Sequence, residues 1–162
     1  MNFFKCLATL LLFIAGELNA TTLQGKVVSV ADGDTINVLD EKNTQHKIRL
    51  LGIDAPEKSQ EYGQRSKHSL HQLIYSKLVR VVFQKKDKYG RIVGKVTHGA
   101  EDVCLEQIKL GMAWHYKQYV SEQSKEDQEL YAHSERRARN HPIGLWKEKQ
   151  SIEPWEYRKQ HK

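Results

Sequence analysis

The side chains best able to do chemistry are acidic and basic residues that gather where short predicted strands end. One group is the Asp-Gly-Asp-Thr segment at residues 32–35, and a second contains Asp54 and Glu57 on either side of Ala-Pro. Carboxylate oxygens are hard ligands, which suit Ca²⁺ or Mg²⁺ rather than zinc. The two segments therefore predict a site for a divalent cation.

Two arginines accompany these carboxylates. Arg49 lies between Ile48 and Leu50 on a predicted strand, so its side chain points away from their face and is free to reach a ligand. Arg91 follows a tight turn at residues 87–90 and begins another strand. Two arginines beside a metal would suit a phosphodiester, because each can grip two oxygens and stabilise the charge that builds up in the transition state.

Each segment alone has an ordinary structural explanation. Residues 32–35 are typical of a hairpin turn with local side-chain hydrogen bonds. Pro56 and Glu57 are typical of the first turn of a helix, and residues 87–91 are typical of a turn. Only the combination of the segments, in this order, is specific.

The elements that must position these residues follow from the hydrophobic pattern. Short β-branched runs separated by turn residues predict three strands within residues 23–51. An apolar face at Leu70, Leu73, Ile74 and Leu78 predicts a helix over residues 61–77. Two further strands are predicted near residues 79–84 and 92–96, a short helix capped by Asp102 at residues 102–110, and a last helix at residues 124–139. This order predicts a small α+β domain whose sheet closes into a barrel.

The first twenty residues differ from the rest. Lys5 precedes an apolar run that is too short to span a bilayer, and a small residue, Ala20, follows, which is the order of a secretory signal. The alternative is a retained amphipathic anchor. We predict a signal peptide at residues 1–20 and one domain at residues 21–162, secreted or periplasmic, monomeric and without a membrane span. Outside the leader the chain has one cysteine, Cys104, so no internal disulfide is expected.

The formal net charge of +6 at pH 7 favours anionic partners, because Lys and Arg side chains that bind phosphates release counterions. Composition alone does not separate a nucleic-acid-binding protein from other small basic proteins.

Taken together, the motifs resemble the successive signature blocks of the staphylococcal nuclease family, and they cover nearly the whole chain after the leader. The blocks are Asp32-Gly33-Asp34-Thr35, Arg49 through Glu57, Asp87-Lys88-Tyr89-Gly90-Arg91, Gly111-Met112-Ala113-Trp114 and Gly144-Leu145-Trp146. The resemblance implies a five-stranded OB-fold Greek-key barrel with three helices.

The resemblance also implies roles for single residues. Asp34 and Asp54 match the family's metal carboxylates, and Ala55 matches a position that binds Ca²⁺ through its backbone carbonyl. Ala55 replaces a threonine of the best-known member, so that hydroxyl's contacts are absent. Glu57 matches the residue that orients or deprotonates the attacking water. Arg49 and Arg91 match the family's two phosphate-binding arginines, and Lys88 and Tyr89 match a pair near the substrate's terminal phosphate. The family's substrate-stacking tyrosines lie after the short helix, where Tyr116 and Tyr119 are the candidates.

The expected function is therefore calcium-dependent, endonucleolytic hydrolysis of DNA, with RNA as a further candidate substrate, leaving 3′-phosphate ends. One alternative is an inactive OB-fold module that only binds single-stranded nucleic acid. A histidine metalloenzyme is a third hypothesis, since His68 and His71 share a helix face, but no third ligand follows at matching spacing. Solvent-exposed helix histidines explain that pair more simply.

Overall fold

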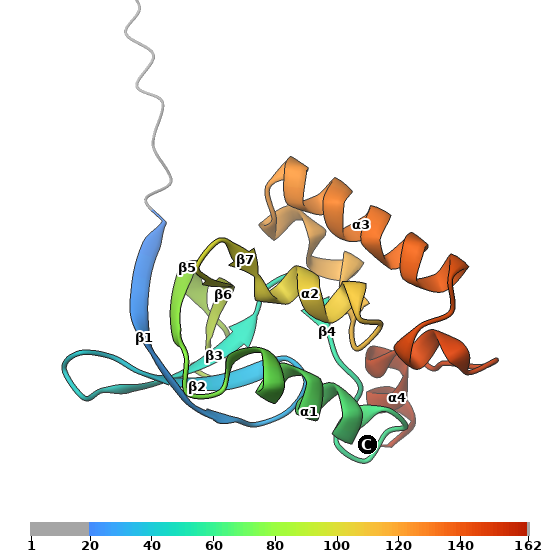
Figure 1. Ribbon diagram of the computed structural model, residues 1–162, viewed down its shortest axis with the longest axis horizontal. Helices are drawn as coiled ribbons and strands as arrows, with labels where there is room; N and C mark the ends of the chain where they lie inside the picture. Colours follow the sequence, from blue (N-terminus) through green and yellow to red (C-terminus); the bar gives the residue numbers. More distant parts are fainter. Residues whose placement is uncertain (1–19, 162) are drawn as a thin grey trace, which may run out of the picture.

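The computed structural model describes residues 20–161. The predicted signal peptide, residues 1–20, thus lies outside the described residues except for Ala20. From Thr21 onward the chain forms a β-barrel with its helices gathered at one side, as Figure 1 shows.

Five strands form the barrel: β1 (Thr21–Val30), β2 (Thr35–Leu39), β3 (Gln45–Leu50), β5 (Leu78–Lys86) and β6 (Ile92–His98). Antiparallel pairing links β3 to β2, β2 to β1, β1 to β5 and β5 to β6. The barrel closes where β3 pairs with β6 in parallel. The predicted OB-fold barrel is confirmed.

The alternating apolar positions fill the barrel interior, as the sequence pattern predicts. Ile36 on β2, Ile48 on β3, Val81 on β5 and Val96 on β6 are all fully buried. Because successive side chains of a strand point to opposite faces, the residues between them face outward. This alternation leaves Arg49 on the outer surface of the barrel wall.

Three short strands extend this frame. β7 (Glu101–Asp102) pairs with the end of β6, and β4 (Ile53–Asp54) pairs with β8 (Trp114–His115). The β4–β8 pair ties the loop that carries Asp54 to the segment that carries Tyr116.

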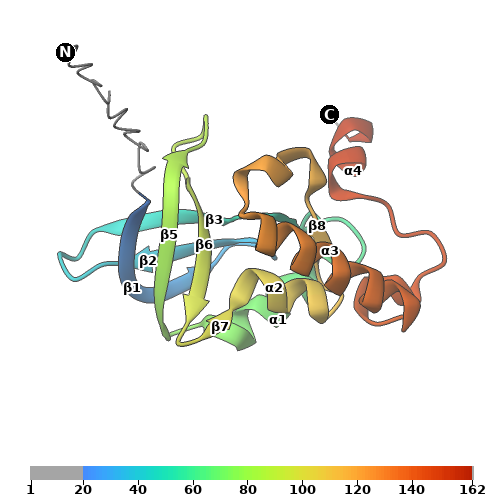
Figure 2. The same cartoon turned by 90° about the horizontal axis from the view of Figure 1, so that it is seen from above.

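The helices are α1 (Gly63–Ile74), α2 (Val103–Lys109), α3 (Lys125–Asn140) and α4 (Pro154–Gln160), with 3₁₀ turns η1 (Lys117–Glu122) and η2 (Gly144–Lys147). α2 contacts β6, α1 and α3, and it therefore lies between the barrel and α3, as Figure 2 shows from above. Asp102 caps α2 by accepting a hydrogen bond from the Leu105 amide, and Ser124 caps α3 through the Asp127 amide.

Two details differ from the sequence pattern. Leu78 is not part of the apolar face of α1, because the helix ends at Ile74 and Leu78 begins β5 with 72% of its surface exposed. The seven-residue helix α4 adds to the three predicted helices. Within residues 20–161, no helix is both long and apolar enough to cross a bilayer.

Candidate active site

The parallel pairing of β3 with β6 brings the two predicted arginines to one face of the barrel wall. Ile48 is in register with Ile92 inside the barrel, and Arg49 is in register with Val93. Because side chains alternate along a strand, Arg91 falls on the same side as Val93 and hence as Arg49. Two residues that are far apart in the chain thus come to the same face of the wall.

These arginines line an open pocket of about 710 Å³. Every residue predicted for the site lines it: Asp34, Arg49, Asp54, Ala55, Glu57, Lys88, Tyr89, Arg91, Tyr116 and Tyr119. Asp32, Lys85 and Lys86 line it as well, together with Arg158, which sequence reasoning missed. The structure therefore gathers the predicted acidic, basic and aromatic groups in one place.

Asp34 is a buried carboxylate in the lining of the pocket. Its Oδ2 accepts a hydrogen bond from the Ala55 amide at 2.8 Å, and its Oδ1 accepts one from the Thr35 hydroxyl at 3.0 Å. Burial raises the pKa of Asp34 to about 7, against the opposing effect of the Arg49 guanidinium. A cation bound beside Asp34 would therefore stabilise the ionised form of this carboxylate.

Arg49 is held firmly among acceptors. Its Nη1 donates to the backbone carbonyls of Leu50 at 2.7 Å and Ile53 at 2.8 Å. Its Nη2 donates to Asp54 Oδ1 at 2.8 Å, and its Nε lies 3.2 Å from Asp34 Oδ1. With 12% of its side chain exposed, Arg49 is a fixed cation between the two predicted metal carboxylates.

Arg158 of α4 joins the carboxylates from the opposite end of the chain. Its Nη1 lies 2.8 Å from Glu57 Oε1, and its Nη2 lies 2.9 Å from Asp54 Oδ2. Burial lowers the pKa of Arg158, but the hydrogen bonds to Asp54 and Glu57 outweigh it and raise that pKa above its ordinary value. No sequence motif includes this residue. Its helix has seven residues, too few for a periodic pattern to predict the helix or the direction of its side chains.

The donor chemistry of the pocket fits a hard divalent cation. Asp34 and Asp54 are nearly fully buried and offer carboxylate oxygens to one pocket. Among residues 20–161, no three Asp, Glu, His or Cys side chains are grouped as a metal-binding cluster. Ca²⁺ takes about 6–8 oxygen ligands, so water, backbone carbonyl and substrate oxygens would have to complete the set. The pocket suits an ion that is shared between protein and substrate.

The turn before β6 presents a second cationic group. Asp87 accepts hydrogen bonds from the Tyr89 and Arg91 amides, and its Oδ2 accepts one from Arg91 Nε at 2.7 Å. Lys88 and Arg91 both approach the Tyr89 ring, at 5.1 and 5.5 Å from its centre. The Tyr89 side chain is 71% exposed, so its ring is open to a ligand.

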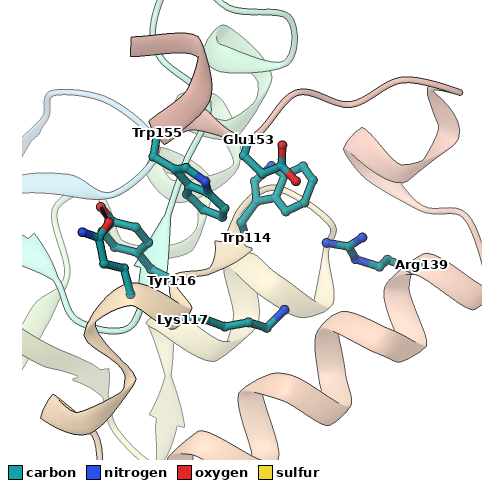
Figure 3. Close-up of a pocket in the computed structure, with 7 residues that line it drawn as sticks. Trp114, Tyr116, Lys117, Arg139, Glu153 and Trp155 are labelled. Carbon is teal, nitrogen blue, oxygen red and sulfur yellow. Dashed lines mark hydrogen bonds between the residues drawn. The ribbon is translucent and has the colours of Figure 1, made fainter. Parts of the chain in front are cut away.

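Tyr116 and Tyr119 form the aromatic side of the pocket. Their rings meet edge to face with centres 5.1 Å apart, and Tyr116 also stacks on Trp155 of α4 at 5.3 Å. Behind Tyr116 lies a smaller cavity of about 220 Å³ that is lined by Trp114, Trp155, Lys117 and Arg139, as Figure 3 shows. Tyr116 therefore stands between the large pocket and an aromatic cavity with cations at its rim.

Two buried glutamines hold the site's loops in place. Gln107 of α2 donates to the Gly33 carbonyl at 2.9 Å and accepts from Ser69 of α1 at 2.7 Å, which anchors the turn before Asp34. Gln123 Oε1 accepts a hydrogen bond from His115 Nε2 at 2.9 Å. Gln123 also packs so closely on Gly52 that a β-carbon there would lie 2.3 Å from its amide nitrogen.

The two helix histidines take no part in the pocket. His68 and His71 are exposed on α1, and His71 stacks on Tyr75 at 4.2 Å. Their positions agree with their interpretation as surface residues.

Comparison with known proteins gives consistent matches. A family model described as staphylococcal nuclease homologue matches residues 47–148. A Haemophilus influenzae protein named "Uncharacterized endonuclease" is 40% identical over 161 residues, which cover 98% of this chain and 87% of the relative. An Escherichia coli protein of the same name is 33% identical over 156 residues, covering 95% and 97%. A Shigella flexneri protein named "Micrococcal nuclease" is 34% identical over 145 residues, covering 84% and 80%. The motifs, the barrel and these matches agree, and the chain belongs to the staphylococcal nuclease homologue family.

Proposed function

We propose that this protein is a calcium-dependent nuclease that hydrolyses phosphodiester bonds of DNA and RNA within the strand and leaves 3′-phosphate ends. The observation that carries the proposal is the convergence of Asp34, Asp54 and Glu57 with Arg49 and Arg91 in one pocket. Nuclease names among the relatives support the reaction class.

Asp34 and Asp54 are the side chains that would hold the cation, with the Ala55 carbonyl as the third protein ligand. Both carboxylates are buried, and Arg49 fixes the position of each. A bound cation supplies charge neutralisation at a phosphate oxygen and lowers the pKa of a bound water.

Glu57 is the proposed acceptor for the proton of the attacking water. Its side chain is 39% exposed and faces the pocket, where both water and substrate have access. The water oxygen bonds to phosphorus, the proton passes to Glu57, and the bond from phosphorus to the 5′-oxygen breaks. The 5′-oxygen takes a proton from solvent, which leaves a 3′-phosphate and a 5′-hydroxyl.

Arg49 and Arg91 are proposed to stabilise the charge on the five-coordinate phosphorus group of the transition state. A guanidinium offers paired N–H donors that match phosphate oxygens, and preorganised donors of this kind contribute strongly to catalysis. Arg49 is already fixed by two backbone carbonyls. With Asp54 and Asp34 also engaged, it offers phosphate its positive charge and the second N–H of Nη2.

Lys88, Tyr89, Tyr116 and Tyr119 are proposed to bind the strand on either side of the scissile phosphate. Aromatic rings stack on bases irrespective of sequence, which suits a nuclease that accepts both DNA and RNA. Lys88 supplies a cation beside Tyr89. We also propose that the protein acts as an exported monomer after removal of residues 1–20.

The test is incubation of the purified protein with plasmid DNA and with RNA, in calcium or in chelator, followed by mapping of the end groups. We expect internal cuts with 3′-phosphate ends in calcium and intact substrate in chelator. A shifted but uncut band in calcium would instead identify a binding module, and 5′-phosphate ends would overturn the proposed direction of cleavage.

A further inference from the structure

Helix α4 lies beyond the stretch of the chain that matches the family model, and its Arg158 lines the pocket. The family model ends at residue 148, whereas α4 spans Pro154–Gln160. Its Arg158 nevertheless contacts Asp54 and Glu57, one a proposed metal carboxylate and the other the proposed proton acceptor. A residue to which the family motifs give no role thus shares the two acidic groups on which the proposed function depends.

Contacts other than these ion pairs also hold α4 in place. The Tyr157 hydroxyl lies 3.1 Å from the Ser59 hydroxyl, and Gln60 Nε2 donates to the Ile152 carbonyl at 2.7 Å. Both contacts join the loop after Glu57 to the C-terminal segment. The backbone of α4 therefore has anchors that do not depend on where the Arg158 side chain points.

In this arrangement both carboxylate oxygens of Asp54 are already engaged. Oδ1 accepts from Arg49 Nη2 at 2.8 Å and lies 3.3 Å from Arg158 Nη1, while Oδ2 accepts from Arg158 Nη2 at 2.9 Å. A cation that binds Asp54 needs at least one of these oxygens. Oδ2 keeps a second lone pair, but a cation bound there would lie beside the positive charge of Arg158, and this repulsion favours the withdrawal of one arginine.

Arg158 is the arginine that can withdraw at lower cost. Arg49 is 12% exposed and also donates to the Leu50 and Ile53 carbonyls, so moving it would leave buried acceptors unsatisfied. The Arg158 side chain is 39% exposed, and its described partners are the carboxylates of Asp54 and Glu57. When it withdraws, solvent and the pocket remain accessible to its guanidinium.

We propose that Arg158 is a third substrate-binding arginine, which pairs with Asp54 and Glu57 in the free protein and transfers to a substrate phosphate once a cation occupies Asp54. The proposal rests on the proposed function for the identity of the ligands. A guanidinium fits carboxylate and phosphate with the same paired donors, so the exchange needs only a side-chain rotation at the rim of the pocket. It also frees Glu57 to accept a proton.

The exchange makes cation and phosphate binding depend on each other. In the free protein Arg158 competes with the cation, and in the cation-bound protein it adds a donor for phosphate. Such coupling between two ligands is reciprocal and can be measured by binding alone.

The first test uses three variants: Arg158→Gln, Arg158→Lys and the matched control Lys159→Gln, which removes a neighbouring charge that pairs with Glu156 on the surface of α4. Calcium binding is measured by calorimetry without nucleic acid. We expect Arg158→Gln to bind calcium about fivefold tighter than both the wild type and Lys159→Gln. Equal affinities in Arg158→Gln and Lys159→Gln would overturn the competition.

The second test titrates thymidine 5′-monophosphate, a single phosphate that is not a substrate for strand cleavage, at saturating calcium. We expect Arg158→Gln to bind it about tenfold more weakly than wild type, Lys159→Gln to match wild type, and Arg158→Lys to fall between them. Unchanged affinity in Arg158→Gln would overturn the transfer to phosphate. Neither test requires cleavage of nucleic acid. A wild-type protein that fails to cut nucleic acid would therefore contradict the proposed function, while the calcium titration would still test the competition between Arg158 and the cation.

Discussion

A β-carbon on Gly63 would lie 1.9 Å from the carbonyl oxygen of Glu57, because the first residue of α1 packs directly against the loop that presents this carboxylate. Glycine is therefore required at position 63, because the Glu57 carbonyl lies too close to leave room for a side chain. We expect Gly63→Ala to displace the Glu57 loop, to destabilise the fold by about 1–3 kcal/mol, and to lower turnover. Thermal unfolding and initial cleavage rates measure both effects.

The control for this substitution is His68→Ala, a change on the exposed face of the same helix. It should leave both the melting temperature and the cleavage rate close to wild type. A Gly63→Ala protein that melts and cleaves like wild type would show that the loop has more room than the packing indicates.

Glu57→Gln should lower turnover by about 10²-fold, because an amide keeps the size of the side chain but accepts no proton at neutral pH. Glu61→Gln, at an exposed site four residues further along the chain, is the matched control. Initial rates on plasmid, together with circular dichroism, separate chemistry from folding. Near-normal turnover would remove Glu57 from the mechanism.

Arg91→Ala should reduce turnover by about 10²-fold or more, since the lost guanidinium stabilises charge in the transition state. Measurement of kcat and KM separately is decisive here. A rise in KM with unchanged kcat would make Arg91 a binding residue and leave transition-state stabilisation to Arg49. The exposed Arg80 of β5, changed to Ala, is the control for loss of one positive charge.

Tyr119→Ala should weaken binding of single-stranded oligonucleotides, since stacking on an aromatic ring contributes about 1–3 kcal/mol per base. Tyr75 is a well-matched control, because it is 47% exposed against 45% for Tyr119 and does not line the pocket. Fluorescence anisotropy with a labelled strand in chelator gives the affinities. Equal losses in the two variants would argue against a base-stacking role.

Cys104 should be unreactive towards a thiol reagent at pH 8 in the native protein. Its side chain is fully buried, and burial raises the pKa of the thiol to about 12, so almost no thiolate is present at that pH. In urea the thiol becomes exposed and its pKa returns towards the ordinary value, so modification should then be rapid. Fast labelling without denaturant would indicate local opening around α2.

Most of the barrel follows from local signals in the sequence. The β-branched alternation of β1 to β3 and of β5 and β6 predicts strands, and Asp102 is the cap expected for α2. Ser124, the first residue of the last predicted helix, caps α3. The β3–β6 pairing has no local signal, because a parallel pair depends on register across a long stretch of chain. The order of elements and the motif resemblance both predict a closed barrel, but neither identifies β3 and β6 as the closing pair.

The candidate site likewise contains residues that the sequence predicts and one that it does not. Asp34, Asp54, Glu57 and the two arginines lie in segments whose combination is recognisable, and the structure gathers them. Arg158 lies on a helix of seven residues, which is too short for an apolar stripe to be distinguished from chance. Leu78 fits both the helical period of α1 and the strand period of β5, so the sequence pattern alone does not place the end of α1, which the structure sets at Ile74.

The parallel closure of β3 on β6 also links catalysis to the kinetics of folding. The interactions that unite Arg49 with Arg91 are non-local, and non-local strand pairing forms slowly because the intervening chain must first lose entropy. Helices and hairpins alone leave the two guanidinium groups apart. In a refolding experiment, enzymatic competence should therefore return only with the slowest barrel-forming phase, after most of the helical signal has been regained.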